Sequence, residues 1–154
     1  MAEIDFRRID VDQYDPDRFL VESLVPPQPP VSLDEIKQRS VAVKRLLSQG
    51  DYQGALETAL RDPPYGGSAE VKNANLQTVL DVLLTLKSNT ITPIIEALTP
   101  ELQDILIKYI YKGMGSPLGQ THGNGVALLL WFEKTVDITS QGAIIRYMSD
   151  RRTV

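Results

Sequence analysis

A run of four prolines interrupted by one glutamine, PPQPP at residues 26–30, divides this chain of 154 residues into two parts. Each proline ring removes a backbone N–H donor and clashes with the preceding helical turn, so the run cannot lie inside a helix. It favours an extended, stiff spacer of the polyproline II type. Helical patterns begin directly after it. We therefore predict an extended, acidic, proline-rich tail over residues 1–31 and one globular domain over residues 32–154.

The acidic charge of the chain is concentrated in this tail. Residues 1–30 contain seven acidic and three basic residues, and the other 124 residues contain 13 of each, so the tail carries the whole net charge of −4. Nucleic-acid binding depends on Lys and Arg side chains that neutralise phosphates, which argues against a nucleic-acid partner. No apolar stretch approaches the roughly 18 residues of a membrane helix, and the first residues lack the apolar core of a secretory signal. We expect a cytoplasmic protein that does not insert into a membrane.

The tail is too polar to form a core alone, yet it contains several apolar and aromatic side chains. Two interpretations remain open: a disordered extension with incidental hydrophobic residues, or a segment that becomes ordered on a partner. In the second interpretation, apolar anchors, arginines and aspartates all contact the partner. These candidate partner-binding residues of the tail are Phe6, Arg7, Arg8, Ile9, Asp10, Val11, Asp12, Tyr14, Asp15 and Phe19.

Residues 32–154 show helical periodicity with recognisable caps. Ser32 and Glu35 fit a capping box, Asp51 and Ser68 are suited to cap the next two helices, and Thr99-Pro100 is typical of a helix start. No run alternates strictly as a strand would. The sequence predicts an all-α fold, a single bundle or solenoid-like domain of six or seven helices.

The second half of the domain gives four further expectations. Thr92-Pro93 predicts a helix start, and the glycine-rich residues 113–125 predict a long loop. The apolar residues 126–132 predict a central buried helix, although a strand is also possible. Ser140 is suited to cap a last helix.

Candidate chemistry is sparse. The chain has no cysteine, which excludes disulfides, thiolate metal sites and cysteine nucleophiles. His122 is the only histidine and has no sequence partner for catalysis. The glycines at 113, 115 and 119 lack the Lys-Ser/Thr pair of a phosphate-binding loop. We expect no catalytic residue, no metal site, no cofactor and no enzymatic activity.

A basic and aromatic segment at residues 108–112, KYIYK, is the best candidate for a contact surface of the body. Tyr109 falls on the apolar stripe of its helix, whereas Tyr111 falls off it between two lysines. An exposed tyrosine with basic neighbours is a typical interface anchor. The candidate partner-binding residues of the body are thus Lys108, Tyr111 and Lys112, with the alternative that Tyr111 lies half-buried along its own bundle.

Four motifs in this order resemble a known family. They are RRIDVDxYD at residues 7–15, DPP at 62–64, KYIYKGM at 108–114 and the final DRRTV at 150–154. Together they cover nearly the whole chain, and they resemble subunit five of the actin-related protein 2/3 complex, its smallest subunit. The intact final motif is similar to the fungal branch of that family.

The resemblance implies a non-catalytic, all-helical subunit of a seven-subunit assembly that nucleates branched actin filaments. It implies that the body docks on subunit four and helps hold the β-propeller subunit one. It also implies that the tail reaches the actin-related subunit two, and that the protein works in the actin cytoskeleton. The alternative function from the residues alone is a freestanding helical adaptor that binds short peptide segments.

Overall fold

The computed structural model describes residues 31–121 and 123–154, which form seven α-helices and no strand. The predicted all-α fold is therefore confirmed for the described part of the chain. The predicted division into tail and domain stays a prediction, because residues 1–30 lie outside the described residues. The helices are α1 Leu33–Gln49, α2 Tyr52–Leu60, α3 Ala69–Thr85, α4 Ser88–Ala97, α5 Pro100–Met114, α6 Pro117–Gln120 and α7 Asn124–Ser149.

Side-chain caps begin most of these helices where the sequence predicts them. Ser32 and Glu35 form the reciprocal capping box at the start of α1, and Asp51 accepts a hydrogen bond from the Gly54 N–H at the start of α2. Ser68 and Thr99 cap α3 and α5 in the same way. These side chains satisfy backbone N–H groups that have no partner inside the helix, which is why the helix starts can be predicted locally.

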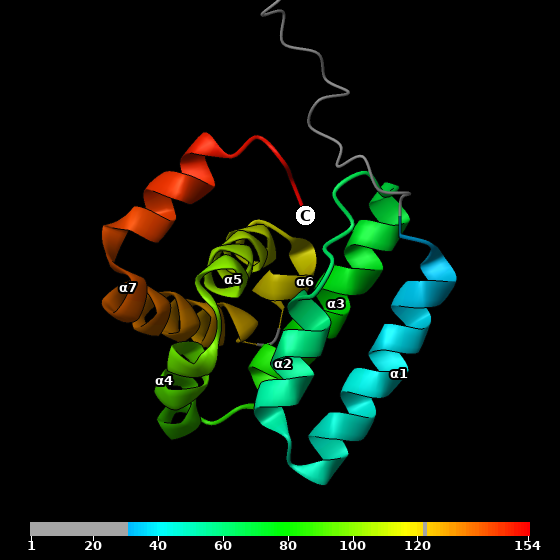
Figure 1. Cartoon of the computed structure of the whole chain (residues 1–154), viewed down its shortest axis with the longest axis horizontal. Coiled ribbons are helices and arrows are strands. Elements are labelled where there is room, and N and C mark those ends of the chain that lie inside the picture. The colour runs from blue at the N-terminus through cyan, green and yellow to red at the C-terminus, as the bar shows by residue number, and fades with distance from the viewer. Residues whose placement is uncertain (1–30, 122) are drawn as a thin grey trace, which may run out of the picture.

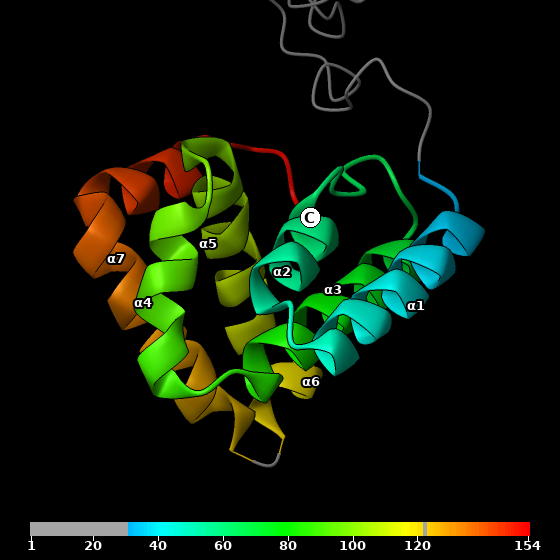
Figure 2. The same ribbon diagram turned by 60° about the horizontal axis from the view of Figure 1, so that its bottom comes forward.

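The helices form two groups that share one core. α1, α2 and α3 pack on one another, and α5 packs on α7, which also contacts α4. Figures 1 and 2 show the first three helices on one side of the molecule and α4, α5 and α7 on the other. α2 and α3 contact α5, so the apolar faces of both groups meet between them. The residues buried there include Leu56, Leu76, Leu80, Leu83, Ile95, Leu106, Tyr109 and Trp131.

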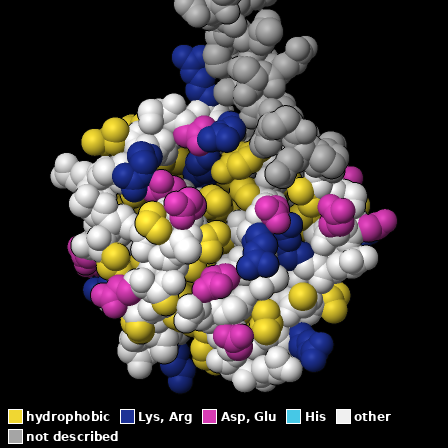
Figure 3. Space-filling model, viewed as in Figure 1, with side chains coloured by type: hydrophobic (Ala, Val, Ile, Leu, Met, Phe, Trp, Pro, Cys, Tyr) yellow, Lys and Arg dark blue, Asp and Glu magenta, His cyan; other side chains and the backbone are white. Residues whose placement is uncertain are grey.

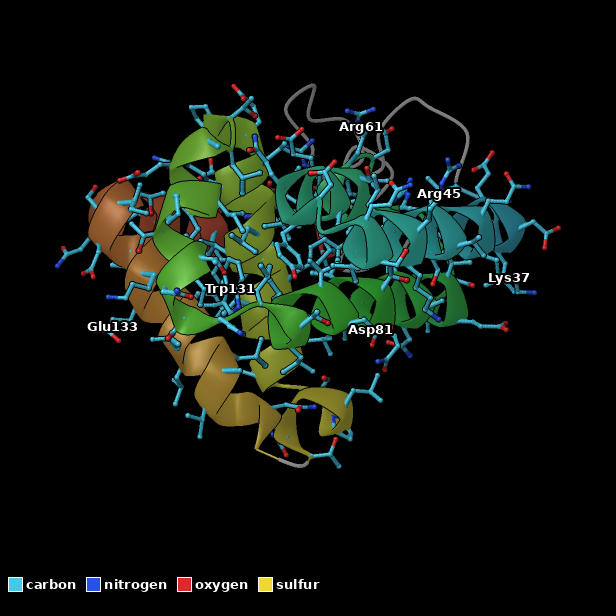
Figure 4. All side chains as sticks on the ribbon, turned by 90° about the horizontal axis from the view of Figure 1, so that it is seen from below. Lys37, Arg45, Arg61, Asp81, Trp131 and Glu133 are labelled. Atoms are coloured by element: carbon cyan, nitrogen blue, oxygen red, sulfur yellow. The ribbon has the colours of Figure 1, made fainter. Side chains whose placement is uncertain are left out.

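Trp131 fixes α7 to the end of α3. Its indole ring is 1% exposed, and its Nε1–H donates to the Leu83 backbone oxygen at 2.9 Å. Figure 4 shows Trp131 directed into the bundle, whereas Glu133 on the same helix points away from it. A buried indole N–H needs such a partner, so α7 can take only this rotation about its axis without leaving a donor unpaired.

The prediction of a helix start at Thr92-Pro93 is wrong. α4 begins at Ser88, and Pro93 lies inside it. The turn before the proline is held in helical conformation because Ile91 is buried in the core. Tertiary packing of one side chain thus outweighs the local signal of the proline, which removes only its own N–H donor.

The prediction of a loop over residues 113–125 is also wrong in part. α5 continues to Met114, and α6 occupies residues 117–120. Gly113 and Gly119 are buried where these helices meet α7. A Cβ atom on Gly119 would lie 2.0 Å from the Gly113 backbone oxygen. These two glycines therefore allow close helix approach rather than chain reversal. His122 lies outside the described residues.

Residues 126–132 form a helix, as predicted, but not a central buried one. Leu128 is buried, whereas Val126 is 74% exposed and Leu129 is 58% exposed. The first half of α7 lies on the outside of the bundle, so only one of its faces contacts the core. None of the helices in the described part has the length and apolar content needed to cross a membrane.

α7 consists of two segments joined by a kink at Ser140. This residue has φ 61° and ψ −175°, a conformation that non-glycine residues rarely adopt. Its hydroxyl accepts a hydrogen bond from the Gly142 N–H at 3.4 Å, so it caps the second segment as predicted. Figure 1 shows the second segment turning away from the first. The kink directs the end of the chain back across the bundle, where it meets the candidate site.

Candidate functional site

α5 distributes the KYIYKG residues over two environments. Tyr109 lies in the core, where its hydroxyl is hydrogen-bonded to the Asn75 side-chain amide, and burial raises its pKa. Tyr111 and Lys112 are half-buried. Lys108 was expected on an exposed, partner-binding face, but its side chain is 7% exposed. The expected exposure of Lys108 is therefore wrong, because the last residues of the chain cover it.

Tyr111 is half-buried against its own domain. Its ring stacks on Tyr147 of α7, with ring centroids 4.3 Å apart and planes 2° apart. It also meets Phe132 edge to face at 5.5 Å. This environment matches the alternative in which the ring lies along its own bundle. A partner contact at its remaining exposed edge stays a prediction.

The last residues of the chain, 150–154, form a segment that lies across α3 and α5, and we call it the C-terminal segment. Asp150 Oδ2 accepts from Lys108 Nζ at 2.6 Å. The same ammonium group donates to the Tyr65 hydroxyl at 3.2 Å and to the Arg152 backbone oxygen at 3.4 Å. Lys108 thereby uses all three of its N–H donors inside the domain.

The end of the C-terminal segment is fixed by two more lysines and by the core. Lys72 Nζ donates to the Thr153 backbone oxygen at 2.8 Å and to its hydroxyl at 3.1 Å. Lys112 Nζ donates to a main-chain oxygen of Val154. The Val154 side chain is 3% exposed and belongs to the core cluster. The segment thus joins α3 to α5 through both polar and apolar contacts.

The ionisation of Asp150 and of the lysines follows from these contacts. Burial alone would raise the pKa of Asp150, but hydrogen bonds from Lys108 and Arg152 and the charge of Lys108 outweigh it and lower the pKa to about 2. Burial lowers the pKa of Lys72. Burial and the nearby charge of Lys72 lower the pKa of Lys112. Both lysines therefore hold their protons less tightly than free lysine does, chiefly because burial disfavours the charged ammonium form.

Asp150→Asn should destabilise the domain more than Lys108→Met. The first change leaves the buried Lys108 ammonium without a carboxylate, at a cost of about 2–4 kcal/mol. The second leaves Asp150 bonded to Arg152 and should cost about 1–2 kcal/mol in the free energy of unfolding. Urea unfolding of both variants and of the double variant measures this order. An equal or larger effect of Lys108→Met would contradict it.

The pair of Asp150 and Lys108 predicts that the free energy of unfolding depends on pH. Since the pKa of Asp150 is about 2 in the folded chain and its ordinary value is 3.8, its carboxylate stabilises the fold above pH 4. This stabilisation should disappear as the pH falls through about 2. The difference in unfolding free energy between the unmodified chain and Asp150→Asn should therefore shrink between pH 4 and pH 2. A difference that stays constant over this range would contradict the assignment.

Tyr111→Ala should destabilise the domain by about 1–3 kcal/mol, because it removes a half-buried ring and its stacking contact with Tyr147. Tyr111→Phe keeps the ring and should have little effect. A double-mutant cycle with Tyr147→Ala should give a coupling of about 0.5–1.5 kcal/mol. If Tyr111→Ala unfolds at the same urea concentration as the unmodified chain, the stacking contributes nothing and the residue is available as an external anchor.

The candidate residues of the tail lie outside the described residues, so their role stays a prediction. Within the body, the sequence did not indicate Tyr65, Lys72 or the C-terminal segment as parts of one site. One signal was available: Val154 is an apolar residue at the end of an otherwise polar run, which is typical of an anchor. The described residues contain no group of three or more His, Asp or Glu side chains that could hold a metal ion.

Comparison with known proteins decides the family. The family model described as ARP2/3 complex 16 kDa subunit (p16-Arc) matches residues 5–154. A protein named actin-related protein 2/3 complex subunit 5 from Saccharomyces cerevisiae is 38% identical over 99% of both chains. The chain belongs to the ARP2/3 complex 16 kDa subunit family. The resemblance predicted from the tail, KYIYKG and DRRTV motifs is confirmed.

Animal members of the family are similar over almost the same length. Subunit 5-B from Xenopus laevis is 36% identical, and the human subunit 5-like protein is 35% identical; each alignment covers 97% of this chain and 94% of the relative. Among these three relatives, the fungal one has the highest identity, in agreement with the predicted fungal branch. The family match extends over residues 5–154 and so includes most of the tail sequence and the whole C-terminal segment.

Proposed function

We propose that this protein is a non-catalytic structural subunit of the actin-related protein 2/3 complex, the assembly that nucleates branched actin filaments. One observation carries the proposal: the family model matches residues 5–154, and the yeast relative that bears the subunit's name is aligned over 99% of both chains. The protein then works in the cytoplasm, within the actin cytoskeleton.

The body and the tail have different roles in this proposal. The body docks on subunit four and helps hold the β-propeller subunit one. Apolar side chains of α6 and α7 are exposed, namely Leu118, Val126 and Leu129, and protein partners typically cover such neighbouring apolar groups. Of the candidate body residues, Lys112 and Tyr111 keep partly exposed side chains, whereas Lys108 acts indirectly by holding the C-terminal segment.

The tail binds the actin-related subunit two. Its anchors are the apolar residues Phe6, Ile9, Val11, Tyr14 and Phe19, which are spaced between charged residues. Arg7 and Arg8 pair with acidic groups of that subunit, and its basic groups pair with Asp10, Asp12 and Asp15. Several anchors are needed, because ordering a segment of this length costs roughly 1–2 kcal/mol per residue in backbone entropy.

Native co-purification tests the proposal. An affinity-tagged full chain, expressed in its own cells, should elute as an assembly about ten times its mass of 17.2 kDa, and mass spectrometry should identify the two actin-related subunits and the β-propeller subunit. The purified chain alone, without other cellular proteins and at the same concentration, serves as the size control. Elution at its own mass, with peptide ligands only, would contradict the proposal and favour the freestanding adaptor.

A further inference from the structure

The strongest feature that the proposed function leaves unused is a groove beside the C-terminal segment. It has a volume of about 540 Å³ and is lined by Lys72, Lys108, Lys112, Tyr147, Met148 and the C-terminal segment; we call it the lysine groove. Figure 3 shows apolar side chains gathered near the middle of this face, with Lys and Arg side chains beside them. The lysine groove thus combines an apolar wall with positive charge.

The lysines of the groove differ in how many of their N–H donors remain available to a ligand. Lys108 uses all three, and Asp150 neutralises it. Lys72 donates only to the backbone and hydroxyl of Thr153, and Lys112 donates only to the main chain of Val154. Each ammonium group has three N–H donors, so at least one remains on Lys72 and two remain on Lys112. Within residues 31–121 and 123–154, no Asp or Glu side chain pairs with either lysine.

The groove therefore suits an acidic segment that also carries an apolar or aromatic side chain. Its lining includes four cationic side chains, those of Lys72, Lys108, Lys112 and Arg152. Asp150 pairs with Lys108 and Arg152, and a terminal carboxylate oxygen of Val154 accepts from Lys112, so positive charge remains in excess. Half-buried Tyr147 and exposed Met148 supply an apolar wall. Burial of the lysine stems strengthens the attraction for a carboxylate, since the charges there are less screened by water.

We propose that, in the unassembled subunit, residues 14–19 of this chain's own tail bind in the lysine groove. This segment reads Tyr-Asp-Pro-Asp-Arg-Phe. Pro16 keeps the residue before it extended, and in an extended chain Asp15 and Asp17 point to the same side, about 6–7 Å apart. Their carboxylates pair with Lys72 and Lys112. Phe19 lies on the same side of the extended chain as the two aspartates and contacts the apolar wall.

The linkage between tail and body makes this occupant more favourable than a separate molecule. Residues 17 and 31 are 14 residues apart, which allows roughly 45 Å of extended chain. A body of this size has a radius of gyration of roughly 14 Å. Figures 1 and 2 place the start of α1 and the C-terminal segment toward the same end of the molecule. A tethered segment has an effective concentration of about 1 mM, so even a weak site is occupied.

This inference goes beyond the proposed function. The tail segment that binds the actin-related subunit two would be covered in the free subunit and released during assembly. The lysine groove and the actin-related subunit compete for one tail segment. Only chains whose groove is empty can bind the subunit, so self-binding lowers the apparent affinity of the tail for it in proportion to the fraction of occupied grooves. Self-binding can be measured on the isolated full chain, so its absence there would leave the proposed function standing.

Carbodiimide cross-linking of the monomeric full chain tests the proposal, because this reagent joins a carboxylate to a lysine amine only when they touch. Mass spectrometry should find Asp15 or Asp17 joined to Lys72 or Lys112. Lys37 and Lys44 on α1 are the controls: both are exposed and near the tail in sequence, and the Lys37 side chain is 67% exposed. A tail without a preferred site would react with these controls first.

The variant Phe19→Ser keeps every carboxylate and lysine but removes the apolar contact. It should lower the yield of cross-links at Lys72 and Lys112 by about fivefold or more. Three outcomes would overturn the proposal: cross-links mainly at Lys37 and Lys44, a yield that Phe19→Ser does not change, or cross-links found only between two copies of the chain.

Discussion

Deletion of residues 1–25 should leave the helical body in the assembled complex and loosen the actin-related subunit two. In the proposed function the body has its own core and its own contacts with the complex, so its docking should not require the tail. Loss of a tethered contact should weaken the attachment of that one subunit by about 10²–10⁴-fold, the range expected when a second linked site is removed. The rate of branched nucleation should fall with it.

A tail of the same length but different sequence provides the control. Replacement of residues 1–25 by a Gly/Ser linker keeps the connection and removes the anchors. If the anchors are responsible, this variant should behave as the deletion does, in both the retention of the actin-related subunit during gel filtration and the nucleation rate. Normal retention and normal nucleation in the deleted form would mean that the tail is a passive extension.

Gly119→Ala should destabilise the domain by at least about 3 kcal/mol, near the upper end for overpacked sites. The added Cβ would lie 2.0 Å from the Gly113 backbone oxygen and 3.0 Å from a methyl carbon of Leu128. Backbone atoms cannot move aside as a flexible side chain can. α6 would therefore have to separate from α5, which would break the packing of both on α7.

Gly125→Ala is the matched control, because it adds the same methyl group six residues later. Its Cβ would have only the Gly119 backbone oxygen near it, at 3.9 Å. Alanine also favours a helix over glycine, by up to about 1 kcal/mol. This variant should therefore be as stable as the unmodified chain or more stable. Thermal and urea unfolding compare the two, and equal stability of both variants would contradict the close approach of α5 and α6.

Four helix starts were predictable from a local capping signal. Ser32, Asp51, Ser68 and Thr99 each accept a hydrogen bond from a backbone N–H three residues later, and this interaction needs nothing from the rest of the fold. The prediction failed at Thr92, where burial of Ile91 holds a helical turn that begins before the proline. Helix propensity contributes little free energy per residue, and burial of an isoleucine side chain contributes more.

Which residues of α7 face the core was less predictable than the helical conformation of α7. An all-apolar run such as residues 126–132 has no polar face to reveal its orientation. The hydrogen bond from Trp131 to the Leu83 oxygen decides which face packs inward, and this partner lies 48 residues away in the sequence. The glycines at 113 and 119 predict a loop from the local sequence, because close approach between two helices leaves no local signal.

The sequence by itself determined the helical class, most helix starts and the family, because these depend on periodicity, caps and short motifs. Only the tertiary structure decided the environment of the KYIYKG residues. Lys108 and Tyr111 both lie within four residues of Lys112 on α5. Lys108 is nevertheless enclosed by the C-terminal segment, whereas Tyr111 stacks on Tyr147. The physical reason is the kink at Ser140, which returns the end of the chain to α5 and turns a basic helix face into a docking site for residues 150–154.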